Sequence, residues 1–130
     1  MFLDTSAIIE ILLSDPKSED LIRQLEASDD PRSTGPTVVY EAAVVLSGKQ
    51  NLSVPESERL VRSLLSELNV TVLAATDQIA SKALDAFDRY GKGRHPAKLN
   101  FGDCFSYAGA KAAGAGLLYV GDDFALTDLA

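Results

Sequence analysis

Cysteine, histidine and tryptophan are almost absent: the 130 residues include one cysteine, Cys104, one histidine, His95, and no tryptophan. A single cysteine cannot form an intramolecular disulfide, and it cannot supply a cysteine-rich zinc site. No uncharged apolar stretch reaches the roughly 18 residues of a transmembrane helix. The first residues, 1–4, also lack the basic region of a secretory signal peptide. We therefore expect a cytoplasmic protein without a membrane partner.

Positive charge is scarce as well, because 12 Lys and Arg stand against 19 Asp and Glu and leave a formal net charge of −7. This balance argues against a protein that holds nucleic acid through overall positive charge. The composition, 46% hydrophobic and 24% charged, is that of an ordinary globular domain. No repeat or low-complexity linker divides the chain, so the sequence predicts one domain over residues 1–130.

Short apolar segments alternate with helical patterns along the chain. We expect strands at residues 2–3, 70–73 and 116–120, the second of them buried, and a polar loop at 29–35. Helices are expected over 7–13, 16–25, 36–46, 53–68, 76–90 and 101–113. The alternation predicts an α/β fold with a short, mainly parallel sheet of about four strands.

Several local signals refine these boundaries. Thr5 or Ser6 is the expected N-cap of the first helix, and the sequence from Ser53 to Glu56 resembles a capping box. The apolar helix 36–46 is expected to stop at Ser47-Gly48 and to be buried on most sides. In helix 76–90 we expect an inward face that ends before Gly91 and consists of Ile79, Ala83, Leu84, Phe87 and Tyr90.

Acidic residues follow the first and last predicted strands. Asp4 comes after the first strand, and Asp122 and Asp123 come after the last. Ligands of open parallel sheets bind beyond the carboxyl ends of the strands, so these positions indicate a site if the strands are neighbours. Ordinary explanations also exist, because Asp4 can be a helix cap and the pair Asp122-Asp123 can belong to a turn.

Two further carboxylates occur on predicted helices. Glu41 lies among valines and alanines, where an ionised group is costly unless a cation or a donor compensates it, or unless it emerges on an exposed stripe. Asp103 falls in a first helical turn, where the helix dipole already favours negative charge. Together with the acids at the strand ends, these residues would form one cluster of carboxylates.

Such a cluster would raise the pKa values of its own members unless divalent cations neutralise it. Ligands that are all oxygen favour Mg²⁺ or Mn²⁺ over zinc. A metal site of this kind suits phosphodiester hydrolysis, because the metal activates water and no protein nucleophile is needed. A basic segment before Asp103 could hold substrate phosphates, although a solvated loop is the commoner explanation; it contains Lys92, Arg94, His95 and Lys98.

The ordered set of motifs resembles the PIN-domain ribonucleases and, within them, the VapC-type toxins of toxin-antitoxin pairs. The resemblance rests on Asp4-Thr5-Ser6-Ala7, on Glu41, and on the segments 90–95, 99–104, 117–124 and 127–128. It covers essentially the whole chain and implies an α/β/α sandwich. By resemblance, the catalytic and metal-binding acids are Asp4, Glu41, Asp103 and Asp123, with Asp122 as the alternative to the last. The supporting residues are Thr5, Ser6, Asp122 and Thr127.

The same resemblance implies an Mg²⁺-dependent endoribonuclease, with Mn²⁺ as a substitute ion. It also implies an RNA substrate such as tRNA or rRNA, a homodimer, and inhibition by a VapB-type antitoxin. A catalytically silent PIN-like module that acts through antitoxin and operator binding is the alternative, although such a scaffold has no need to concentrate four acids. A phosphatase or receiver domain ranks last, because no acid lies two residues after Asp4.

Overall fold

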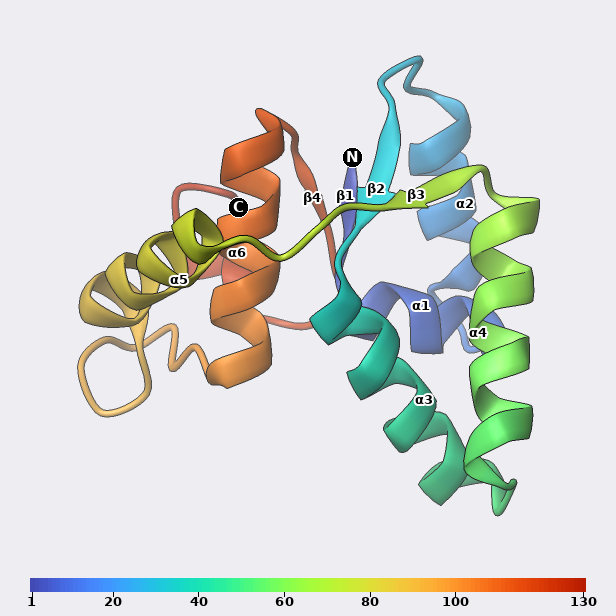
Figure 1. Cartoon of the computed structure of the whole chain (residues 1–130). Coiled ribbons are helices and arrows are strands. Elements are labelled where there is room, and N and C mark those ends of the chain that lie inside the picture. The colour runs from blue at the N-terminus through green and yellow to red at the C-terminus, as the bar shows by residue number, and fades with distance from the viewer.

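A four-stranded parallel sheet forms the centre of the computed structural model, which describes all residues 1–130 (Figure 1). The strand order is β3-β2-β1-β4. The strands are β1 (Phe2–Leu3), β2 (Arg32–Thr34), β3 (Val70–Val72) and β4 (Leu117–Leu118). Strand β1 pairs with β2 on one side and with β4 on the other. Asp4, which follows the inner strand β1, therefore lies at the carboxyl ends of the strands, with the end of β4 beside it.

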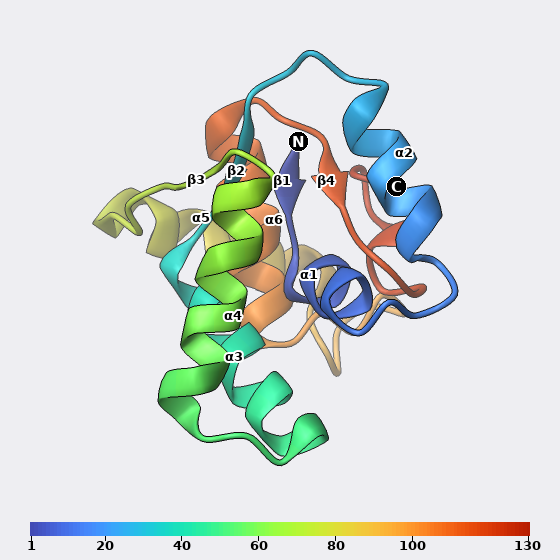
Figure 2. The same cartoon turned by 90° about the vertical axis from the view of Figure 1, so that its right-hand side faces the viewer.

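Helices cover both faces of this sheet. Helices α5 and α6 lie on one side and α1 to α4 lie on the other, as Figures 1 and 2 show from two directions. Their bounds are α1 (Thr5–Leu12), α2 (Ser18–Glu26), α3 (Pro36–Gln50), α4 (Val54–Glu67), α5 (Asp77–Tyr90) and α6 (Phe101–Ala113), and a 3₁₀ helix follows at Phe124–Leu126. The arrangement is an α/β/α sandwich, which confirms the predicted fold class. None of these helices has the length and apolar character that crossing a bilayer requires.

Close packing of α6 against β1 positions the site. Phe2 and Leu3 are almost completely buried. A Cβ atom at Gly109 would overlap the Phe2 ring, so this glycine allows α6 to approach the central strand. The N-terminal half of α6, which carries Asp103, consequently lies beside the end of β1 and its Asp4.

The second strand lies inside the segment 29–35 for which the sequence predicted a loop, and that prediction is wrong. Arg32, Ser33 and Thr34 are polar, yet they form β2 between β1 and β3. Specific partners satisfy them: Thr34 Oγ1 donates to Leu3 O at 2.8 Å, and the Arg32 guanidinium donates to two carbonyl oxygens at helix ends. Tertiary hydrogen bonds thus place a polar segment inside the sheet.

Three predicted helix boundaries and one predicted capping box need correction. Helix α1 begins at Thr5, and Asp4 is its N-cap in place of the expected Thr5 or Ser6. Helix α2 begins at Ser18, two residues later than predicted. Helix α3 continues through Ser47-Gly48 to Gln50, and its C-cap Asn51 has a left-handed φ of 52°. Ser53 caps α4 by accepting from Glu56 N–H, but the reciprocal bond of a capping box is missing. The predicted extents of α5 and α6 are confirmed within one residue.

Burial was overestimated on the outer surfaces. Helix α3 has an exposed stripe, since Tyr40 is 73% exposed and Val44 is 48% exposed. Strand β3 is an edge strand whose Val72 is exposed, and the last strand covers only 117–118 of the predicted 116–120. Leu84 and Phe87 of α5, which were predicted to face inward, are also exposed. The residues of α5 that are buried are Ala83 and Ala86.

Candidate functional site

A cavity of about 320 Å³ opens beyond the carboxyl ends of β1 and β4. Residues of α1, α3 and the N-terminal turn of α6 line it, together with Val120 after β4. Three of the four predicted acids, Asp4, Glu41 and Asp103, meet here although about 100 residues separate the first from the last. The full lining set is Asp4, Thr5, Ser6, Ile9, Glu10, Asp15, Glu41, Val45, Lys49, Asn100, Asp103 and Val120.

Asp4 is buried and held at both carboxylate oxygens. Its Oδ2 accepts from Ser6 N at 3.0 Å and from Ser6 Oγ at 2.6 Å, and its Oδ1 accepts from Ser106 Oγ at 2.6 Å. Ser6 Oγ in turn accepts from Val120 N at 3.0 Å, which fastens the end of β4 to the same group. These three hydrogen bonds fix the orientation of the Asp4 carboxylate.

Asp103 forms a reciprocal capping box with Asn100 at the start of α6. Asn100 N donates to Asp103 Oδ2 at 3.1 Å, and Asp103 N donates to Asn100 Oδ1 at 2.9 Å. Burial and, less strongly, the negative charges of Asp4, Asp123 and Glu41 together raise the pKa of Asp103 to about 6, against the lowering effect of the Asn100 bond. The other three predicted acids are therefore close enough to act electrostatically on Asp103.

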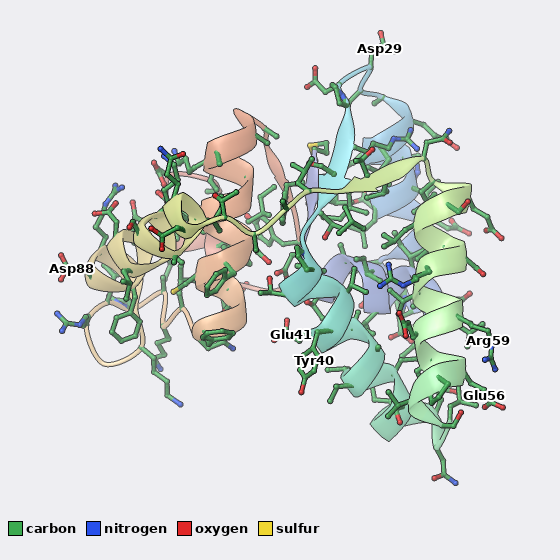
Figure 3. All side chains as sticks on the ribbon, in the orientation of Figure 1. Asp29, Tyr40, Glu41, Glu56, Arg59 and Asp88 are labelled. Carbon is green, nitrogen blue, oxygen red and sulfur yellow. The ribbon has the colours of Figure 1, made fainter.

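Glu41 rests against the backbone of α6. A Cβ atom at Gly102 would overlap the Glu41 carboxylate, so that group occupies the space beside Gly102 and next to Asp103. Figure 3 shows Glu41 on the side of α3 that faces α6. The side chain is half-buried, and the positive end of the α6 dipole lies beside it. The positive end of the helix dipole offsets part of the cost of placing an ionised Glu41 among apolar residues.

Asp122 and Asp123 are exposed and do not line the cavity. Asp123 stands at the N-cap of the 3₁₀ helix with no hydrogen bond from its side chain to that helix. The negative charge of Asp123 contributes to the raised pKa of Asp103, which favours Asp123 as the fourth acid.

The supporting residues of the prediction have different surroundings. Ser6 orients Asp4, as described above. Thr5 Oγ1 is buried without a hydrogen-bond partner. Thr127 is buried and braces the chain end, because its Oγ1 donates to Phe124 O at 2.7 Å and accepts from Leu129 N at 3.1 Å.

The four predicted phosphate contacts lie outside the cavity lining. Arg94 pairs with Asp88 at 3.4 Å, and His95 packs edge-on against Tyr90 while its Nδ1 accepts from Ala97 N at 3.0 Å. Lys92 and Lys98 are exposed on the same loop. Their contact with a substrate stays a prediction.

Sequence reasoning missed four residues that shape this site: Lys49, Asn100, Gly102 and Ser106. A signal existed for two of them. Ser106 follows Asp103 by one helical turn and so shares its face, and Asn100 lies three residues before Asp103, which is the spacing of a capping box. The roles of Lys49 and Gly102 depend on how α3 packs against other elements, which the local sequence does not reveal.

The chemistry of the cavity fits a hydrated divalent cation. Five of its lining residues carry carboxylates, and the negative charges around Asp103 favour the binding of a cation. No three acidic, histidine or cysteine side chains are grouped closely enough to enclose one ion. Mg²⁺ commonly keeps several waters and uses only one or two carboxylates, so this spacing is compatible with it.

The family model and the similar sequences agree on one protein family. The PIN domain matches residues 1–129. A VapC ribonuclease of Rhizobium meliloti is 39% identical, and the alignment covers 98% of each chain. A ribonuclease VapC of Mycolicibacterium smegmatis is 42% identical over 100% of this chain and 98% of the relative.

Two solved structures have the same fold at low sequence identity. The sarcin-ricin loop cleaving toxin VapC20 of Mycobacterium tuberculosis aligns with a TM-score of 0.71 at 20% identity, over 95% of this chain and 92% of that one. A toxin-antitoxin complex from Klebsiella pneumoniae contains a chain that aligns with a TM-score of 0.72 at 19% identity, over 98% and 92%.

Proposed function

The chain belongs to the PIN-domain family and is a ribonuclease of the VapC toxin group, and from this premise we propose that its acidic cavity hydrolyses RNA phosphodiester bonds. One observation carries the proposal. Asp4, Glu41 and Asp103 converge on the cavity from the start of α1, from α3 and from α6. The charges of Asp4, Glu41 and Asp123 all act on Asp103. Because such convergence is electrostatically unfavourable, it indicates a function that needs the carboxylates in one place.

VapC ribonucleases of this family generally depend on divalent metal ions. We propose Mg²⁺ for this chain, with Mn²⁺ as a substitute, because the available donors are carboxylate oxygens. When bound, the ion lowers the pKa of a coordinated water and stabilises negative charge on phosphate oxygens. Asp4 and Asp103 are the proposed direct ligands.

The remaining groups prepare the site for that chemistry. Ser6 and Ser106 hold the Asp4 carboxylate in one orientation, so it needs no rearrangement when a cation arrives. Glu41 and Asp123 complete the acidic set from α3 and from the chain end. The protein supplies position and charge, and a water molecule is the proposed nucleophile.

We further propose the partners and setting of this activity. One domain over residues 1–130 would cut tRNA or rRNA in the cytoplasm as a homodimer, and a VapB-type antitoxin would hold it inactive. The VapC relatives and the fold shared with a chain of a toxin-antitoxin complex support the antitoxin. The aromatic residues Tyr40 and Phe101, which are 73% and 74% exposed, offer apolar surface for a protein partner.

Cleavage of a mixed tRNA and rRNA pool by the purified chain tests the proposal. Discrete products should form with Mg²⁺ or Mn²⁺, disappear in EDTA, and be absent for folded Asp4→Asn and Asp103→Asn variants. Unchanged cleavage by either variant would remove that residue from the proposed machinery. A folded wild type that neither binds Mg²⁺ nor cleaves RNA would support the silent binding module.

A further inference from the structure

Lys49 is the one positively charged residue among those that line the acidic cavity. It lies on α3, four residues after Val45 and eight after Glu41, and all three residues line the cavity. Side chains spaced by four share one face of a helix, so this stripe of α3 forms a continuous wall. Figure 3 shows α3 continuing well beyond Glu41. Lys49 lies about 12 Å along the helix axis from Glu41.

No carboxylate forms an ion pair with the Lys49 ammonium group. The ion pairs of the chain involve Arg62, Arg94 and Lys111, and Lys49 takes part in none. Two acids, Glu10 and Asp15, line the same cavity, but Glu10 Oε2 already accepts from Lys17 N at 2.9 Å. The Lys49 side chain is exposed. It is therefore a free cation at the wall of a cavity that is otherwise acidic.

A cation at this position would offset the repulsion between the acidic cavity wall and the phosphates of an RNA backbone. The scissile phosphate would lie among the acids with bound metal, whereas a flanking phosphate along α3 would meet negative charge from Glu10 and Asp15. A lysine ammonium group is a compact donor suited to a phosphate oxygen.

We propose that Lys49 binds an RNA phosphate that flanks the scissile one and thereby sets the path of the substrate along α3. The inference rests on the proposed ribonuclease function and adds to it a binding residue outside the acidic set. An alternative role exists, because a cation in the last turn of a helix also stabilises the helix dipole. Arg23 in the last turn of α2 has the same position relative to its helix but does not line the cavity, so it is a matched control.

The experiment compares Lys49→Gln, Lys49→Arg and Arg23→Gln with the wild type, using the tRNA and rRNA pool in Mg²⁺ at several salt concentrations. For Lys49→Gln we expect kcat/KM to fall about tenfold at low salt through KM, with kcat unchanged. The dependence of log(kcat/KM) on log salt should become less steep by about 0.7, as one single-strand phosphate contact predicts. Lys49→Arg should retain most of the activity, and Arg23→Gln should match the wild type.

The outcomes separate this inference from the function on which it rests. If the wild type cleaves and Lys49→Gln behaves like Arg23→Gln, the phosphate contact is wrong while the ribonuclease function stands. If the wild type does not cleave, the binding of a labelled single-stranded RNA decides. A weaker affinity of Lys49→Gln than of Arg23→Gln supports the contact, and equal affinities overturn it.

Discussion

At the scale of single residues, the geometry of the site depends on side chains that carry no charge. Ser6 and Ser106 fix Asp4, and Gly102 leaves the space that the Glu41 carboxylate occupies. Asp4, Asp103 and Asp123 were predictable from the sequence because each follows a strand or begins a helix. Glu41 was predictable because a carboxylate among valines and alanines needs compensation. Their uncharged neighbours were not, since a serine or a glycine on a helix has no distinctive pattern until its partner from another element is known.

Substitution Gly102→Ala should reduce activity without removing an acid. The new methyl group would overlap the Glu41 carboxylate and displace it from Asp103, so we expect kcat/KM to fall at least tenfold. Gly48→Ala is the matched control, because Gly48 also lies in a helix and a Cβ there meets nothing within 4 Å. Alanine should stabilise that helix by about 0.5–1 kcal/mol and leave activity unchanged. Equal activity of the two variants would contradict the role given to Gly102.

Asp103→Asn should stabilise the metal-free protein at neutral pH. The pKa of Asp103 is raised from 3.8 to about 6 by burial and by its acidic neighbours, so the folded state binds this proton more tightly than the unfolded state. The charged carboxylate therefore costs stability above pH 6, and the cost disappears as the pH falls toward 3.8. After allowance for solvent screening we expect a gain of about 1 kcal/mol.

Urea unfolding in EDTA at pH 7.5 and at pH 4 measures this effect. Asparagine still offers an oxygen to Asn100 N–H, so the helix cap can persist in the variant. The advantage of Asp103→Asn should be present at the higher pH and mostly lost at the lower. A variant less stable than the wild type at pH 7.5 would show that the carboxylate contributes to the fold.

At the scale of elements, α6 connects the site to the centre of the sheet. It packs on β1 through Gly109, it presents Asp103 and Ser106 on one face, and its Tyr107 hydroxyl donates to Asp128 Oδ1 at 2.6 Å near the chain end. Helix α6 was predictable because its N-cap, first-turn acid and terminal Gly114 are local signals. Strand β2 was not, because its polar residues are held by bonds to Leu3, Leu25 and Leu68 that arise only in the folded chain.

Ser106→Ala should weaken metal binding more than it weakens the fold. The substitution removes the donor to Asp4 Oδ1, and loss of such a supporting bond typically costs 10- to 100-fold in metal affinity. Ser57→Ala is the control, because Ser57 is an equally buried serine whose Oγ donates to Ser53 O on α4, away from the site. Both variants should lose about 1 kcal/mol of stability.

The Mg²⁺ concentration for half-maximal cleavage separates the two serine variants. It should rise about tenfold or more for Ser106→Ala and stay at the wild-type value for Ser57→Ala. A parallel rise in both would mean that general loosening of the fold, and not the bond to Asp4, controls the affinity.

At the scale of the whole molecule, a protein with a net charge of −7 acts on a polyanion. The acids of the cavity account for part of that charge and serve the proposed metal site, so bulk charge was a poor guide to the substrate. The basic loop at 92–98 was a candidate phosphate contact from its composition, although a solvated loop was the commoner explanation. That its basic residues lie outside the cavity lining and that Lys49 lies within it depends on tertiary packing, which composition does not encode.

We propose that only the metal-binding acids, and not the whole acidic lining of the cavity, carry out RNA hydrolysis. The most direct measurement is kcat/KM for RNA cleavage in Mg²⁺ by Asp103→Asn beside Asp15→Asn, since both residues line the same cavity but only Asp103 belongs to the proposed metal-binding set. We expect Asp103→Asn to lose cleavage and Asp15→Asn to stay within a few-fold of the wild type. Comparable losses in both variants, or substantial cleavage by Asp103→Asn, would contradict it.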